Sequence, residues 1–194
     1  PVVMFDRVTN DILCDKVIVD DTQAAFEAVQ KLIDTKFKRI ALLTTHDYIS
    51  VGKLRTDGYI KALQNNDINV SEKLIVRIED TDNCLDEISE LFEKQKFDAI
   101  FAVNELFAVT AIKHAASLGI SVPKELSIIG FTDGIISKYS SPSITTVGQN
   151  GIKMGGKAAQ LLIDRLENDE EESELYRTEV IETHLEVRES TPLF

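Results

Sequence analysis

The sequence is poor in the residues that build metal centres, disulfide scaffolds and membrane spans. Its 194 residues include two cysteines, Cys14 and Cys84, and three histidines, and neither set has the short spacing of metal ligands. Two cysteines cannot form the framework of a small disulfide-rich protein, so we expect two reduced thiols. No apolar run approaches the about 20 residues that cross a bilayer. The sequence therefore predicts neither a metal site nor a membrane partner.

Positive charge is also scarce. The chain has 21 lysines and arginines against 33 aspartates and glutamates, which gives a formal net charge of −12. Its longest basic cluster, KFKR at residues 36–39, falls where a helix is expected to give way to a strand, and cations there complement the helix dipole. Nucleic-acid-binding surfaces are usually basic, so we expect this chain not to bind DNA by itself.

The familiar signatures of catalysis are missing as well. No G-x-G-x-x-G follows a strand, and the chain contains neither a Walker A loop nor a G-x-S-x-G elbow. Acidic residues near the expected strand ends have no partner that the sequence can place beside them. These absences predict a protein that is not an enzyme, has no catalytic residue and needs no cofactor.

What is present is a regular alternation of short apolar strands and amphipathic helices. Strands are predicted over residues 2–5, 16–19, 39–43, 74–78, 98–103 and 126–131, and helices over 24–37, 51–66, 82–94 and 104–118. Gly119 is well placed to end the last of these helices. This alternation implies right-handed crossovers and an α/β fold with a doubly wound, mainly parallel sheet.

The rhythm breaks after residue 140. SPSITTVGQN at 141–150 is expected to be extended, and a helix is predicted over 151–167. The acidic stretch NDEEESE at 168–174 is interpreted as a solvated loop. One long strand is predicted over residues 178–188.

Polar side chains follow the predicted strands at the points where the strands end. The carboxyl ends of parallel strands share one edge of the sheet, where α/β proteins bind ligands. Asn104 could instead be only a helix N-cap, Thr132 and Asp133 only part of a turn, and Arg55 only a solvated cation. Together they predict a polar cleft suited to a hydroxylated small molecule. The polar residues at these strand ends are His46, Asp47, Tyr48, Glu79, Asp80, Thr81, Asn104, Glu105, Thr132 and Asp133.

An ordered series of motifs resembles one family across nearly the whole chain. The series runs PVVMFDR, VDDTQAAFEAVQKLI, KRIALL, LRTDGYIKAL, FDAIFAVNELFAVTAIKHAASLGISVPKELSIIGF, SPSITTVGQN, MGGKAAQLLIDRL and VRES. It is similar to the LacI/GalR family of bacterial transcription regulators. The resemblance implies a periplasmic-binding-protein-like fold of type I, in which two α/β subdomains close around a small effector, commonly a sugar. It also implies a cytoplasmic homodimer that binds operator DNA through a helix-turn-helix headpiece.

The same resemblance suggests how the chain divides. Residues 1–5 match a crossover strand, and residues 6–147 with 175–194 match the C-terminal effector-binding subdomain. Residues 148–174 match a crossover and one helix of the N-terminal subdomain. The start, PVVMFDRVTN, has no initiator methionine and no basic segment of a signal peptide, so we interpret the chain as part of a longer protein whose headpiece lies outside it. An extracytoplasmic sugar-binding protein of a transporter, which shares this fold, is the alternative.

Individual residues are carried over by position. Arg55 matches the family arginine that binds ligand hydroxyls or a carboxylate, and Asn104 matches the family asparagine. Thr132 stands where the family usually has aspartate, which leaves a sugar, a sugar acid and a sugar phosphate open as the ligand. Arg55→Ala is expected to weaken effector binding and to leave the thermal midpoint nearly unchanged. The remaining candidate ligand-binding residues are Asp133, His46, Tyr48 and Phe131.

Overall fold

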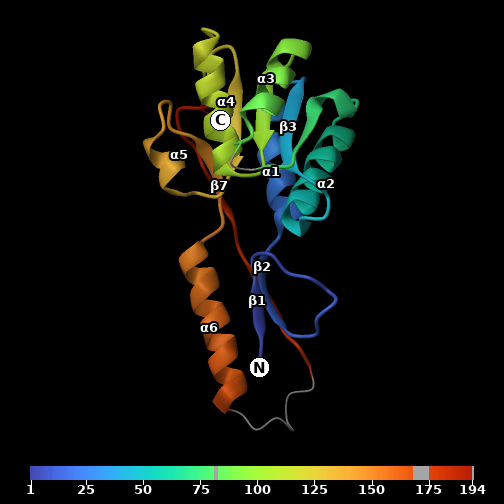
Figure 1. The fold of residues 1–194 in the computed structure, drawn as a ribbon, viewed down its shortest axis with the longest axis vertical. Helices are drawn as coiled ribbons and strands as arrows, with labels where there is room; N and C mark the ends of the chain where they lie inside the picture. Colours follow the sequence, from blue (N-terminus) through green and yellow to red (C-terminus); the bar gives the residue numbers. More distant parts are fainter. Residues whose placement is uncertain (81–82, 168–174, 194) are drawn as a thin grey trace. The chain divides into compact units, whose positions relative to one another are not determined.

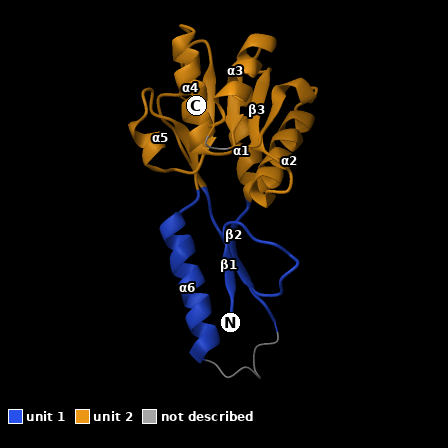
Figure 2. Cartoon of the chain, in the orientation of Figure 1, with its two compact units in different colours: residues 1–20, 149–183 blue, residues 21–148, 184–194 orange. Residues whose placement is uncertain are grey.

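The computed structural model describes residues 1–80, 83–167 and 175–193 (Figure 1). The chain forms two compact units that each contain residues from distant parts of the sequence (Figure 2). Unit 1 consists of Pro1–Asp20 and Gln149–Thr183, and unit 2 of Asp21–Gly148 and His184–Phe194. The mainly parallel α/β fold predicted from the sequence is confirmed in unit 2.

Unit 1 is a small parallel sheet packed against one long helix. The strands lie in the order β1-β2-β8, with bounds β1 (Val3–Phe5), β2 (Asp15–Val19) and β8 (Thr178–Ile181). Helix α6 (Gly151–Glu167) begins and ends where the sequence predicted and presents one apolar stripe. That stripe forms the core of unit 1 with the strands, through Met154, Ala158, Leu161, Val17, Val19 and Ile181.

A buried carboxylate in β2 links two other segments of unit 1. The Asp15 side chain is inaccessible to solvent and accepts hydrogen bonds from Arg165 Nε at 2.8 Å, Arg165 Nη2 at 2.9 Å and the Arg177 backbone N–H at 2.6 Å. The hydrogen bond from Arg165 lowers the pKa of Asp15 more than burial raises it. This pairing joins the last turn of α6 to the segment that leads into β8.

The units divide the chain differently from the boundaries suggested by the sequence. Residues 6–20 and 175–183 were expected with the larger subdomain, but they lie in unit 1. The reason is strand pairing: β2 is the central strand of the small sheet, and β8 pairs with it in parallel. A pairing between residues 162 positions apart, such as Lys16 with Thr178, leaves no local signal in the sequence.

Unit 2 is a six-stranded sheet with helices on both faces. The strand order is β4-β3-β5-β6-β7-β9, and every neighbouring pair is parallel except β7 with β9. The central strands are buried along their whole length, as expected of a parallel sheet covered on both faces. The strand bounds are β3 (Ile40–Thr45), β4 (Ile75–Ile78), β5 (Ala99–Ala102), β6 (Ser127–Phe131), β7 (Thr145–Gly148) and β9 (His184–Glu186).

The helices of unit 2 form two layers. Because the chain moves from β3 outward to β4 and then back across the sheet to β5 and β6, right-handed crossovers put α2 on one face and α3 and α4 on the other. Helix α1 packs on α2 so closely that a Cβ at Gly58 would lie 2.3 Å from the Thr22 carbonyl oxygen. The helix bounds are α1 (Asp21–Asp34), α2 (Ser50–Asn65), η1 (Glu72–Leu74), α3 (Leu85–Lys94), α4 (Glu105–Ser117) and α5 (Ile135–Tyr139).

One predicted helix end is confirmed, whereas other predictions of secondary structure differ from the structure. Gly119 follows α4 with φ 75°, so the predicted stop is confirmed. The predicted strand over 178–188 is wrong, because β8 pairs with β2 in unit 1 whereas β9 pairs with β7 in unit 2. Helix α5 was not predicted. The acidic stretch at 168–174 lies outside the described residues.

Candidate ligand-binding site

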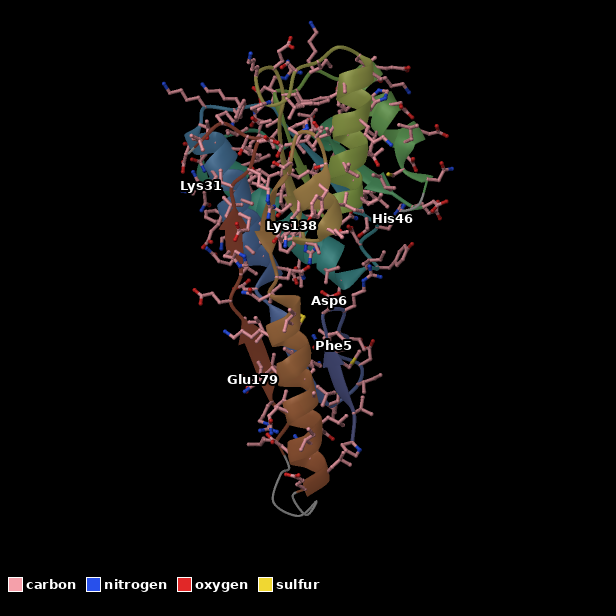
Figure 3. All side chains as sticks on the ribbon, turned by 90° about the vertical axis from the view of Figure 1, so that its left-hand side faces the viewer. Phe5, Asp6, Lys31, His46, Lys138 and Glu179 are labelled. Atoms are coloured by element: carbon pink, nitrogen blue, oxygen red, sulfur yellow. The ribbon has the colours of Figure 1, made fainter. Side chains whose placement is uncertain are left out.

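The expectation that polar residues share one edge of the sheet agrees with the strand order. Strands β3, β4, β5 and β6 are parallel neighbours, so the residues after them lie at the same carboxyl-terminal edge. We call this surface of unit 2 the polar edge and define it as residues 46–55, 79–80, 103–105 and 132–139. Figure 3 labels His46 and Lys138, which come from the segments after β3 and β6.

Arg55 is the most constrained side chain of the polar edge. It lies in the second turn of α2, and its residue is only 4% exposed. Its Nε donates to Asp21 Oδ1 at 2.7 Å, and its Nη1 donates to the Val103 carbonyl at 2.6 Å. The guanidinium carbon lies 3.6 Å from the centroid of the Phe131 ring, which is the geometry of a cation–π contact. Arg55 is therefore not the solvated cation that was one alternative.

Asp21 is the residue that the sequence reading missed. It is the first residue of α1 and is only 4% exposed. An acid in the first turn of a helix is favourable for the helix dipole alone. The pairing with Arg55 spans 34 residues, and no short-range pattern encodes it.

Asn104 has the N-cap role that was weighed for it. Its Oδ1 accepts the Phe107 backbone N–H at 2.8 Å, and its backbone is extended at the start of α4. Among the described residues its Nδ2 has no hydrogen-bond partner, and the residue is half-buried. A cap role and a ligand-binding role are thus compatible, because each uses a different atom of the amide.

Thr132 holds an unusual backbone conformation. Its φ is 76°, in the left-handed region that disfavours β-branched residues, and its N–H donates to the Val147 carbonyl at 2.9 Å. Backbone strain of this kind gathers at functional sites. Aspartate and asparagine tolerate this region better than threonine does.

Asp133 points toward a structural partner. Its Oδ1 accepts Arg188 Nη2 at 2.6 Å and Thr146 Oγ1 at 3.1 Å, and Lys138 lies 3.4 Å from Oδ2. Burial alone would raise the pKa of Asp133, but Arg188, Thr146 and Lys138 lower it below its ordinary value. The carboxylate therefore links the segment after β6 to Arg188, in the segment after β9.

The aromatic candidates differ in exposure. The His46 and Tyr48 rings are stacked with centroids 5.8 Å apart, and Tyr48 is 77% exposed. Phe131 is fully buried beneath Arg55, so it supports the guanidinium and presents no ring face of its own. Of the aromatic residues after β3 and β6, the exposed rings are those of Tyr48 and Tyr139.

Through its contacts, Arg55 brings the ends of two strands together. It touches Val103, one residue before Asn104, and Phe131, one residue before Thr132. His46 and Tyr48 contact each other through their stacked rings. The described residues contain no cluster of acids, histidines or cysteines that could hold a metal ion. Nor does any described helix have the length and apolarity to cross a membrane.

The fold and the polar edge define the class to which the chain belongs. It is a member of the periplasmic binding protein-like domain family, whose model matches residues 29–191. Proteins of similar sequence are transcription regulators. The chain is 34% identical over 174 residues to the HTH-type transcriptional regulator MalR of Clostridium butyricum, which covers 89% of this chain and 51% of that protein.

Two further comparisons concern one kind of regulator. The HTH-type transcriptional regulator CelR of Thermobifida fusca is 32% identical over 176 residues, covering 90% of this chain and 51% of that protein. The solved structure of a CelR–cellobiose complex superposes with a TM-score of 0.89 at 29% identity, covering 98% of this chain and 58% of that one. The chain thus spans about half the length of the curated relatives that it matches.

Proposed function

We propose that the chain is the ligand-sensing part of a bacterial LacI-type transcription regulator and that a small hydroxylated effector binds at its polar edge. The observation that carries the proposal is the convergence at Arg55, which joins the residues beside Asn104 and Thr132 through its contacts with Val103 and Phe131. Its relatives are regulators, and cellobiose in the CelR complex supports a carbohydrate as the effector.

Each side chain has a role in this proposal. The guanidinium of Arg55 suits vicinal oxygens because its donors form a rigid fork. Asn104 offers its Nδ2 as a donor, and Thr132 offers a hydroxyl. Tyr48 is the candidate for stacking on a sugar face, with His46 against its ring. Asp133 and Phe131 act behind this surface, the first through Arg188 and the second beneath Arg55.

The whole protein is proposed to act as a cytoplasmic homodimer that contacts DNA through a separate headpiece. The net charge of −12 supports a division of labour in which this chain senses and another segment binds DNA. Closed two-fold dimers are the commonest soluble assemblies. The relatives favour this reading over a transporter's extracytoplasmic binding protein and over an enzyme.

The test uses the full-length protein and DNA from upstream of its own gene. Fluorescence anisotropy should show a salt-sensitive complex, and a sugar such as cellobiose or ribose should change its Kd at least several-fold. The 194-residue chain alone should form no complex even at low salt, where electrostatic attraction is strongest. A full-length protein that binds a sugar and no DNA would support the transporter protein instead.

A further inference from the structure

The cations of the polar edge already have carboxylate partners within the protein. Arg55, which would be the natural partner of an anionic ligand, is paired with Asp21 at 2.7 Å, and the two side chains are 5% and 4% exposed. A ligand anion at this guanidinium would lie beside a buried carboxylate. Like charges in a poorly solvated site disfavour each other strongly, so Asp21 acts against such a ligand.

The cations after β6 are balanced in the same way. Arg188 lies 2.6 Å from Asp133, with both side chains less than a fifth exposed, and Lys138 lies 3.4 Å from the same carboxylate. Arg188 also donates to the Ile144 carbonyl at 2.8 Å, which fixes its orientation toward the strands. Arg188 and Lys138 therefore both pair with the carboxylate of Asp133.

Two more cations, Lys53 and Arg77, also have carboxylate partners. Lys53, two residues before Arg55, lies 2.7 Å from Asp57. Arg77, at the end of β4, lies 3.7 Å from Asp47 and 3.2 Å from a carboxylate of η1. Among the described residues, each lysine or arginine at or beside the polar edge therefore has a carboxylate within 4 Å.

The start of α4 does not offer an anion site either. A helix N-terminus attracts negative charge through its exposed N–H groups. Here Asn104 Oδ1 accepts the Phe107 N–H, and Glu105 places a carboxylate in the first turn. That carboxylate accepts Ser137 Oγ at 2.9 Å and so is held at the polar edge.

We infer that the effector is a neutral, hydroxylated compound and that sugar phosphates and sugar acids are excluded, because Asp21 neutralises Arg55 in the protein itself. This rests on the proposed function, since it concerns the ligand of the same edge. Neutral hydroxyls can donate to carboxylates and accept from amides without a charge partner. The departure from aspartate at Thr132 then removes one acceptor but creates no anion-binding site.

The test is a matched panel titrated calorimetrically into the full-length protein. Glucose, cellobiose and ribose form the neutral set, and glucose 6-phosphate, gluconate and ribose 5-phosphate form the anionic set. We expect at least one neutral sugar to bind at least about tenfold more tightly than its anionic counterparts, with little dependence on salt. An anionic member that binds as tightly or more tightly overturns the inference and leaves the proposed function standing. Binding of no member of either set counts against both.

A variant pair tests the cause. Asp21→Asn removes the carboxylate that pairs with Arg55, so the ratio of anionic to neutral affinity should rise at least about tenfold. Asp57→Asn, which removes the exposed partner of Lys53, should leave that ratio unchanged. An unchanged ratio in folded Asp21→Asn protein would show that Asp21 does not set ligand charge. If Asp21→Asn does not fold, the wild-type panel decides the question.

Discussion

Replacing Arg55 by alanine is expected to destabilise unit 2 even before a ligand is considered. The substitution removes one partner of an ion pair whose side chains are 5% and 4% exposed, and it leaves the carboxylate of Asp21 buried without its cation. Breaking a buried pair in this way costs about 3–5 kcal/mol. The contact of the guanidinium with the Phe131 ring, 3.6 Å from its centroid, is lost as well.

That free energy corresponds to a large change in thermal midpoint. At about 2–4 °C per kcal/mol for a chain of this size, the midpoint should fall by roughly 6–20 °C. This differs from the expectation drawn from the sequence, which left the midpoint nearly unchanged. The sequence shows an arginine with no visible partner, whereas the structure shows a buried carboxylate that the substitution would strand.

The assay is a double-mutant cycle followed by calorimetry or circular dichroism. Wild type, Arg55→Ala, Asp21→Asn and the double variant are compared without ligand. The coupling between the two positions should be at least about 1 kcal/mol, because Asp21→Asn removes the stranded charge. A fall of less than about 2 °C in Arg55→Ala, or purely additive losses, would refute the reasoning.

Five further substitutions test the packing, the backbone and the ion pairs. Gly58→Ala should lower the free energy of unfolding by about 1–3 kcal/mol, because its Cβ would meet the backbone of α1. Gly156→Ala, on the open face of α6, should raise it by about 0.5–1 kcal/mol. Urea unfolding midpoints measure both changes. Thr132→Asn should raise the free energy of unfolding by about 1 kcal/mol, because asparagine tolerates a φ of 76°, and no gain would mean that Thr132 is not strained. Asp15→Ala should cost about 3 kcal/mol at pH 7, while Asp164→Asn at an exposed pair should change the midpoint little. Since the pKa of Asp15 is lowered by folding, its contribution is full above the unfolded pKa of about 4 and is lost as pH falls through the folded value, so the penalty of Asp15→Ala should shrink in acid.

Most of the element order was predictable because it is encoded locally. Buried parallel strands are short apolar runs, and helices that cover a sheet have a repeating apolar stripe, so both can be recognised within a few residues. The segment at 178–188 shows where this fails. Its alternation is typical of one strand, but β8 and β9 belong to different sheets, and their partners are β2 and β7. That choice depends on residues far away in the sequence.

The candidate site could likewise be predicted only in part from the local sequence. The place where polar residues gather could be predicted from the ends of the strands, since a parallel sheet brings the carboxyl ends of its strands together. The partners of those residues could not be predicted, because Asp21 is 34 residues from Arg55 and Arg188 is 55 residues from Asp133. Those partners determine whether a charged side chain supports the fold or meets a ligand.

The most direct test of the central claim is ligand binding to Asn104→Ser in the full-length protein. Serine caps a helix as well as asparagine does, so α4 should keep its stability while the Nδ2 donor is lost. Titration with the neutral sugar that binds wild type should show an affinity lower by about 5- to 150-fold, the effect of losing a donor worth about 1–3 kcal/mol, whereas Asn69→Ser on an exposed loop should bind as wild type does. An unchanged affinity in a stably folded Asn104→Ser protein would place the ligand away from the polar edge and contradict the account.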